Sequence, residues 1–109
     1  MQTFHCAAID LGATSGRVAV GHVSAESISF DIVHRFPHEA KRDENGTITW
    51  DWQGLLTEIE KGLINAAKHY EITSVAVDTW AVDYILYNAD GSIAAPTYSY
   101  RDFRTDGIM

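Results

Sequence analysis

The sequence predicts an α/β fold in which an antiparallel three-stranded meander is followed by a helix and then by a parallel strand. Two observations indicate this order. Three strand-like segments joined by short turns occupy the first third of the chain, and one helical segment with apolar residues at spacings of three and four precedes a further strand-like run. The 109 residues are 46% hydrophobic and 21% charged, which suits a globular chain with a buried core and excludes disorder over most of the length.

The first three elements are strands. Phe4–Asp10 is a short apolar run that ends at the turn-rich residues 11–16, and a second strand is expected from Arg17 to Val23. Over residues 27–36 every second side chain is apolar or aromatic, which predicts a strand with one largely buried face: Ile28, Phe30, Ile32, His34 and Phe36.

A loop and a helix come next. Residues 37–47 are polar and contain the turn signal Asn45-Gly46, so they are expected to form an exposed loop. Asp51 is a candidate N-cap for a helix from Gln53 to His69, because capping carboxylates satisfy free N–H groups of the first turn. The apolar positions of this helix form one stripe, which must cover a sheet: Leu55, Leu56, Ile59, Leu63, Ile64 and Ala67.

The run Ser74–Asp78 is continuously apolar, as in strands that are covered on both faces. A right-handed crossover would bring it beside the first strand, in parallel. Asp78 and Asp10 would then lie near each other at the strand tips, where open α/β sheets usually build their sites. Two further short strands are expected at Tyr84–Tyr87 and Ile93–Pro96.

Charge and cysteine content exclude several classes of partner. With 15 acidic and 8 basic side chains the net charge is −7, which offers no footprint for nucleic acid or an anionic membrane, so neither partner is expected. Cys6 is the only cysteine, so no internal disulfide forms and a reducing cytosol is the natural compartment. The sequence shows no secretory signal and no run of about 20 apolar residues, and a cytoplasmic location is expected.

The segment Asp10–Arg17 carries the first candidate site. It places a carboxylate at a strand end, then a hairpin with two glycines and two hydroxyls, then a guanidinium group. Gly12 and Gly16 are expected to adopt positive φ so that N–H groups can face phosphate oxygens. Asp10 could hold Mg²⁺, and Arg17 could stabilise phosphoryl charge. The alternative is a tight hairpin whose glycines serve only the turn, since neither a Walker A loop nor a dinucleotide fingerprint is present.

Two later segments are also candidates. In Val77–Tyr84 two carboxylates five residues apart flank Trp80, and acids beside a flat ring are typical of sugar recognition. The alternative is a core tryptophan with two turn-forming aspartates. Tyr98–Thr105 interleaves cations, an acid and aromatic rings, and its alternative is a solvated loop with local salt bridges.

Three ordered blocks together resemble the FGGY family of carbohydrate kinases, and in particular its rhamnulokinase subgroup: Ala8–Arg17, Val77–Asp83 and Tyr100–Thr105. The resemblance covers nearly the whole chain. It implies an RNase H-like (actin-like ATPase) core and transfer of the γ-phosphate of ATP to a hydroxyl of a ketose, with L-rhamnulose as first choice. The implied cofactors are ATP and Mg²⁺, and the implied partner is the small-molecule sugar.

The resemblance also implies roles for individual residues. Asp10 is expected to place Mg²⁺ through water, and the hairpin is expected to bind nucleotide phosphates through Ala13, Thr14, Ser15, Gly16 and Arg17. The sugar is expected to be held by Trp80, Ala81 and Asp83. The subgroup usually has glycine where this chain has Ala81, so the sugar preference is open at this position.

Length sets the expected extent of the domain. FGGY kinases have two domains and are several times longer, so residues 1–109 are expected to be the first portion of the N-terminal kinase domain, with the catalytic base, an aspartate, beyond Met109. The chain alone is then expected to be inactive and to self-associate. Two alternatives remain, which are a non-catalytic actin-like ATP-binding module and an RNase H-like metal-dependent nuclease that uses Asp10, Asp78 and Asp83.

Overall fold

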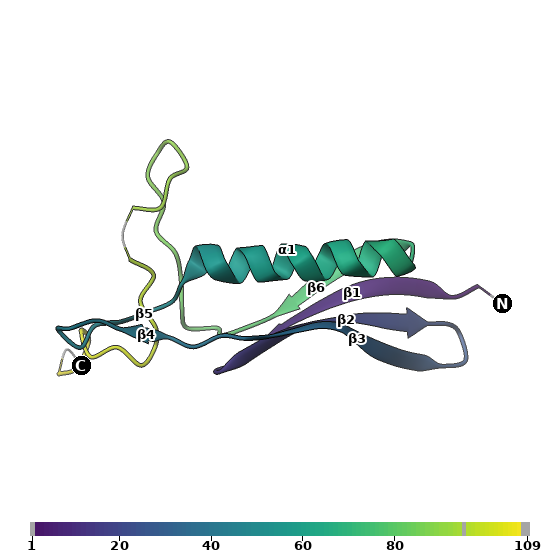
Figure 1. Ribbon diagram of the computed structural model, residues 1–109, viewed down its shortest axis with the longest axis horizontal. Helices are drawn as coiled ribbons and strands as arrows, with labels where there is room; N and C mark the ends of the chain where they lie inside the picture. The colour runs from purple at the N-terminus through teal and green to yellow at the C-terminus, as the bar shows by residue number, and fades with distance from the viewer. Residues whose placement is uncertain (1, 95, 108–109) are drawn as a thin grey trace.

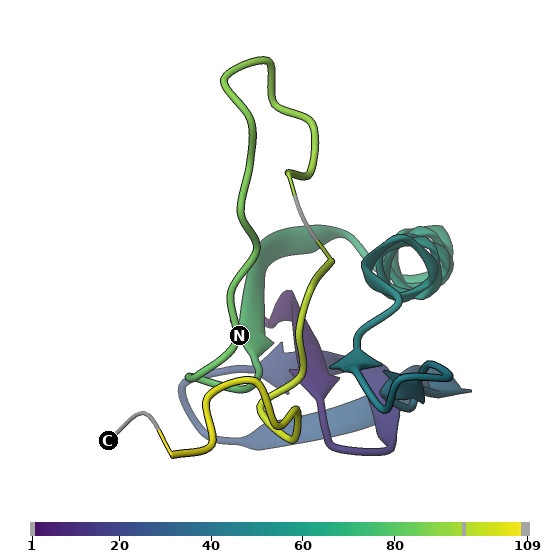
Figure 2. The same cartoon turned by 90° about the vertical axis from the view of Figure 1, so that its left-hand side faces the viewer.

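Four strands form a mixed sheet in the order β3-β2-β1-β6, and one helix lies on one of its faces (Figure 1, and along the helix axis in Figure 2). The computed structural model describes residues 2–94 and 96–107. The elements in chain order are β1 (Phe4–Leu11), β2 (Ser15–Val23), β3 (Ile28–Pro37), β4 (Lys41–Arg42), β5 (Ile48–Thr49), α1 (Trp52–His69) and β6 (Ile72–Asp78). The predicted meander, helix and parallel strand are therefore confirmed.

The register of the sheet brings the predicted site residues to one end. β1 and β2 pair antiparallel with Asp10 opposite Arg17, and β1 and β6 pair parallel with Asp10 opposite Asp78. Parallel neighbours present their carboxyl ends at the same edge of a sheet. The two aspartates consequently lie side by side, as the crossover argument predicts.

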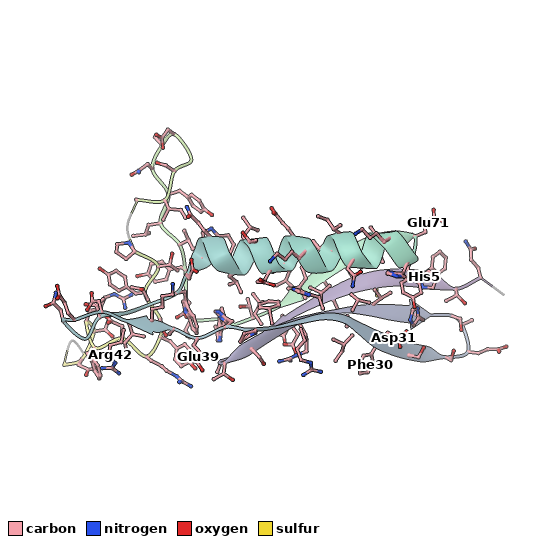
Figure 3. All side chains as sticks on the ribbon, viewed as in Figure 1. His5, Phe30, Asp31, Glu39, Arg42 and Glu71 are labelled. Carbon is pink, nitrogen blue, oxygen red and sulfur yellow. The ribbon has the colours of Figure 1, made fainter. Side chains whose placement is uncertain are left out.

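A bulge in β3 changes which face its side chains occupy. Val18 of β2 pairs with His34, but the next residue, Ala19, pairs with Ile32, so Val33 is the extra residue. The amide of Asn65 in α1 donates to the Val33 carbonyl at 2.6 Å. A one-residue bulge reverses the alternation beyond it. The predicted single apolar face is therefore wrong, and Ile28, Phe30 and Ile32 in the first half of β3 are exposed. Figure 3 shows Phe30 on the side away from α1.

Polar groups lie on the helix side at the far end of the sheet, where the bulge places Asp31 of β3 beside His22 of β2. The Nδ1 atoms of His5 and His22 lie 2.9 Å apart, and His22 Nε2 lies 2.8 Å from an oxygen of Asp31. The ring of Tyr70, the C-cap of α1, packs on both imidazoles with centroids 4.8–5.0 Å away. Hydrogen bonds and ring contacts therefore hold this end together.

The helix packs closely on the sheet at Gly62. A Cβ atom at this position would lie 2.3 Å from Cγ2 of Val18, so only glycine fits. Asp51 is the N-cap, as predicted, and accepts from the N–H of Gly54 at 3.1 Å. The buried helix residues are Leu55, Gly62 and Ala66. The predicted stripe was too wide, because three of its members lie on the exposed flank: Leu56, Ile64 and Ala67.

Strand β6 is the edge strand, and the expectation that both of its faces are buried was wrong. Val75 and Val77 are 53% and 57% exposed. The cause is the position of α1, which packs on β1, β2 and β3. The apolar composition of β6 is thus that of a covered strand, although nothing in the described part of the chain covers it.

The connections also differ in part from expectation. The loop 37–47 contains β4, which pairs with β5, and its predicted turn has Gly46 at φ +83°. In place of two further strands, residues 84–94 form a projecting arm (Figures 1 and 2). A bridge between Tyr87 and Ile93 joins its two limbs, together with backbone hydrogen bonds from Asn88 to Ser92 and from Ala94 to Leu86. Residue 95, within the predicted strand Ile93–Pro96, lies outside the described residues. No described helix is long and apolar enough to cross a membrane.

Candidate functional site

Asp10, at the carboxyl end of β1, and Arg17, near the start of β2, form an ion pair. The Arg17 guanidinium donates through Nη1 to Asp10 Oδ2 and through Nη2 to the Ser15 hydroxyl, the latter at 3.0 Å. Arg17 Nε is buried without a partner among the residues that the structure describes. An unsatisfied buried donor beside a hairpin is what an absent anion would leave.

The two glycines of this hairpin act differently from expectation. Neither Gly12 nor Gly16 has positive φ. Gly16 is buried, and a Cβ there would lie 2.3 Å from the ring of Phe36, so close packing requires glycine. The Gly12 N–H donates to the Ser15 carbonyl at 2.9 Å and closes the turn. The expected positive φ is therefore wrong at both positions, where glycine serves the turn and the packing.

The hairpin tip nevertheless presents donors to solvent. Ala13 and Thr14 are exposed, and their N–H groups have no hydrogen-bond partner within residues 2–94 and 96–107. The Thr14 carbonyl accepts from the His38 N–H at 2.9 Å, which fixes the tip from the other side. Free N–H groups next to a hydroxyl form a concavity suited to phosphate oxygens.

The three aspartates do not converge. Asp10 and Asp78 are cross-strand neighbours, whereas Asp83 accepts a 2.5 Å hydrogen bond from Trp50 Nε1. No group of three or more His, Cys, Asp or Glu side chains placed to hold a metal occurs in the described part of the chain. The residue set that the nuclease alternative needs is therefore not assembled.

Three aromatic rings form the core of the second candidate site. Trp50 and Trp80 stack with centroids 4.4 Å apart and planes 18° from parallel, and His38 stacks on Trp50 at 4.6 Å. Burial lowers the pKa of His38, and the nearby charge of Asp51 opposes this. Of these rings the sequence indicated only Trp80 as a site residue; His38 lies in the predicted loop 37–47, and Trp50 directly precedes the predicted N-cap Asp51. Their aromatic character beside a polar turn was the one available signal.

A hollow of about 550 Å³ opens beside this stack, between α1, the tips of β1 and β6, and the segment after β6. Trp50, Trp80 and Asp83 line it, together with many apolar side chains. Ala81 is exposed and does not line it. Of the predicted sugar residues, two therefore face one cavity and the third does not.

The third block, Tyr98–Thr105, is a structural clamp. The buried Asp102 accepts from the backbone N–H of Ile48 at 2.8 Å and from that of Arg104 at 3.0 Å. The Arg104 guanidinium lies 3.5 Å from the same carboxylate and 4.1 Å from the ring centroid of Tyr98. The predicted local salt bridge exists, but its carboxylate is buried and ties the C-terminal segment to β5.

Because of Asp102, the free energy of unfolding is expected to decrease at acidic pH. Its pKa is lowered, mainly by the Ile48 N–H that donates to it, so its stabilising effect is present above its ordinary value of 3.8 and is lost as pH falls further. Asp102→Asn is expected to lower the urea midpoint at pH 6, with a smaller difference from the parent at pH 3. The exposed Asp106→Asn is the control, and an equal difference at both pH values would contradict this role.

The chain is similar in sequence to known proteins. No protein-family model matches the chain. It is 42% identical to a protein of Mannheimia succiniciproducens named rhamnulokinase, over 112 aligned residues that cover the whole chain. It is 40% identical to a protein of the same name from Enterobacter sp. strain 638, over 108 residues that cover 96% of the chain. The chain is homologous to rhamnulokinases. It spans 23% and 22% of the length of these two relatives, less than a quarter.

Proposed function

We propose that the chain is the first portion of the N-terminal domain of an ATP-dependent kinase with an RNase H-like core. This kinase phosphorylates a hydroxyl of a ketose, and L-rhamnulose is its preferred substrate. One observation carries this proposal. Asp10 and Asp78 lie side by side at the carboxyl ends of parallel strands, and the exposed donors of the hairpin tip follow directly after β1. The identity to proteins named rhamnulokinase supports the substrate class.

The residues present fit a nucleotide phosphate and its metal. The Oδ2 atom of Asp10 accepts from Arg17, which leaves Oδ1 for a water of Mg²⁺. The tip N–H groups and the Thr14 hydroxyl would hold phosphate oxygens, and the buried Nε of Arg17 would gain an acceptor. Mg·ATP, when bound, supplies the transferable phosphoryl group and part of its charge compensation. The chain's own residues orient that group and stabilise its charge.

The sugar would lie along the hollow beside Trp50 and Trp80, since apolar ring faces suit sugar C–H groups. Asp83 Oδ2 accepts from the indole N–H of Trp50 and so orients that ring. The other oxygen of Asp83 remains as an acceptor for a sugar hydroxyl. Ala81 is exposed and does not line the hollow, so any influence of its methyl group on sugar choice is indirect.

A non-catalytic ATP-binding module would share the hairpin without needing a second cavity. The aromatic hollow, with the carboxylate of Asp83 in its wall, favours the kinase over this alternative. The nuclease is disfavoured because Asp83 is bonded to Trp50 and the net charge is −7.

The test needs a full-length enzyme, which is a chimera in which the chain replaces the matching segment of the Mannheimia succiniciproducens rhamnulokinase. We expect the highest kcat/KM for L-rhamnulose in a coupled ADP-release assay that also contains D-xylulose, gluconate and glycerol. Another preferred sugar would contradict the substrate, and no sugar-dependent turnover would contradict the kinase. Ala81→Gly in the same assay reports whether the methyl group shifts the preference.

The 109-residue chain is the matched control. We expect it to show no sugar-dependent ATP turnover, because it spans less than a quarter of the length of the rhamnulokinases that it matches and phosphoryl transfer needs a closed cleft. Its exposed edge strand should also make it elute from size-exclusion chromatography above its monomer mass. Turnover by the monomeric chain would mean that it already holds the catalytic base.

A further inference from the structure

Two histidines face each other across β1 and β2, at the end of the sheet opposite Asp10. His5 and His22 are direct partners in the antiparallel register. Their Nδ1 atoms lie 2.9 Å apart, and their ring planes are 81° from parallel. Neither residue lines the aromatic hollow. We propose that this pair binds one divalent transition-metal ion through the two Nδ1 atoms.

The distance between the two nitrogens suits an ion in place of a proton. Two imidazole nitrogens at 2.9 Å share one proton, because their lone pairs would otherwise repel each other. A tetrahedral zinc ion with Zn–N bonds of about 2.0–2.1 Å holds its nitrogens roughly 3.3–3.4 Å apart. The rings of His5 and His22 therefore need to separate by only about half an ångström to admit the ion.

Asp31 fixes the tautomer of His22 for this role. An ionised carboxylate only accepts hydrogen bonds, so His22 Nε2 carries the proton of the 2.8 Å contact with Asp31. In a neutral His22 ring the Nδ1 atom is then a lone pair, directed at His5. Metal-binding histidines commonly donate their other N–H group to a carboxylate in this way, which holds the orientation of the ring.

The proton between the two rings has a place to go when an ion binds. In the pair of neutral rings His5 donates from Nδ1, because His22 holds its proton on Nε2. Coordination uses both Nδ1 lone pairs, so His5 loses this proton to water and takes one up on Nε2. No net proton is released, and the pair stays neutral beside the ion.

The surroundings give the ion access to water. His5 lines a surface hollow of about 300 Å³, together with Tyr70, His69 and Glu71. The described residues include no group of three or more side chains placed to hold a metal, so water completes the coordination. Figure 3 shows His5, Asp31 and Glu71 at the same end of the molecule. These two carboxylates and the net charge of −7 favour a cation there.

The donor atoms determine which ions bind. Imidazole nitrogens suit Zn²⁺, Ni²⁺ and Cu²⁺, whereas Mg²⁺ and Ca²⁺ prefer oxygen ligands. The site therefore differs in position and in ligand chemistry from Asp10, and it does not depend on the proposed kinase activity. An ion held by His5 and His22 joins β1 to β2 at this end of the sheet.

The test is a calorimetric titration of the 109-residue chain with zinc chloride at pH 7.5, without ATP or sugar. We expect one ion per chain, which an excess of magnesium chloride does not displace. His5→Asn and His22→Asn should each weaken binding by at least about tenfold, because losing even an outer partner of a metal ligand typically costs 10–100-fold. His69→Asn is the control. His69 is exposed and its Nδ1 atom lies 2.9 Å from the Asn65 carbonyl oxygen, so its loss should change the affinity by less than about twofold.

Long-range ¹H–¹⁵N spectra of the parent chain identify the ligating nitrogens without any substitution. They decide the case in which circular dichroism shows that a variant has lost its fold. Zinc should shift the Nδ1 resonances of His5 and His22 more than any other imidazole resonance. Four results would overturn the proposal: no saturable zinc binding, parent-like affinity in either variant of the pair, an equal loss in His69→Asn, or zinc shifts centred on another histidine.

Discussion

Replacing Asp10 with asparagine in the full-length enzyme is expected to lower kcat by roughly 10²–10³-fold, the loss typical of one contact that stabilises transition-state charge. The asparagine keeps the size of the side chain and an acceptor for Arg17, but it removes the charge that would hold a metal-bound water. Stability should change little, because the Asp10–Arg17 pair is partly exposed and such pairs contribute about 1 kcal/mol or less. Steady-state kinetics and urea denaturation measure the two effects separately.

Asp31→Asn is the matched control, since Asp31 lies at the opposite end of the sheet beside His22. It should leave kcat within about twofold of the parent, because it touches neither the hairpin nor the aromatic hollow. A parent-like kcat for Asp10→Asn would remove Asp10 from the site. An equal loss in both variants would show that the sheet as a whole, and not the carboxylate, had been disturbed.

Phe36→Ala is expected to lower the free energy of unfolding of the chain by about 3–5 kcal/mol, the range for removing a buried aromatic side chain. Phe36 is 3% exposed and belongs to the core cluster with Ile9, Leu11, Val18 and Leu55. Urea denaturation measures the loss. Phe30→Ala is the control, because Phe30 is 69% exposed on the uncovered face and should change stability far less.

The same ring explains Gly16 and gives a second measurement. Gly16→Ala alone should destabilise by about 1–3 kcal/mol, because its methyl group overlaps the Phe36 ring. In the Phe36→Ala background the methyl has space, so the same substitution should be nearly neutral. Additive effects in the double variant would contradict this packing.

The sequence predicted an element correctly where one repeat of apolar residues, of a strand or of a helix, extends over the whole segment. The apolar run of β1, the capping carboxylate Asp51 and the helical spacing after it all had one interpretation, and the topology placed Asp10 beside Asp78. The period failed at Val33, since a bulge leaves the composition unchanged while it reverses the faces. The apolar stripe of the helix also left out Gly62, which is buried because Val18 across the interface leaves no room for a side chain.

The candidate site was predictable only in part for a related reason. Asp10, Arg17 and Trp80 stand in segments with strong local signals, and they lie where those signals indicate. Trp50 and His38 became site residues through contacts that only the three-dimensional fold creates. The hydrogen bond from Trp50 to Asp83 joins residues 33 positions apart, and the spacing of residues along a helix or strand cannot predict a contact at that separation.

The bulge at Val33 divides the sheet into two regions with different resistance to opening. Toward the hairpin tip, Phe36 and its neighbours form a large apolar core. Beyond the bulge the buried apolar side chains are the smaller Ala7, Val20 and Ala66, and the histidine pair, Asp31 and Tyr70 complete the helix side. Amide hydrogens should therefore exchange from the far end first, as in partial unfolding that begins where buried apolar contact is least. The slowly exchanging half is the one that carries the candidate site, so that end of the sheet can remain intact while the other end frays.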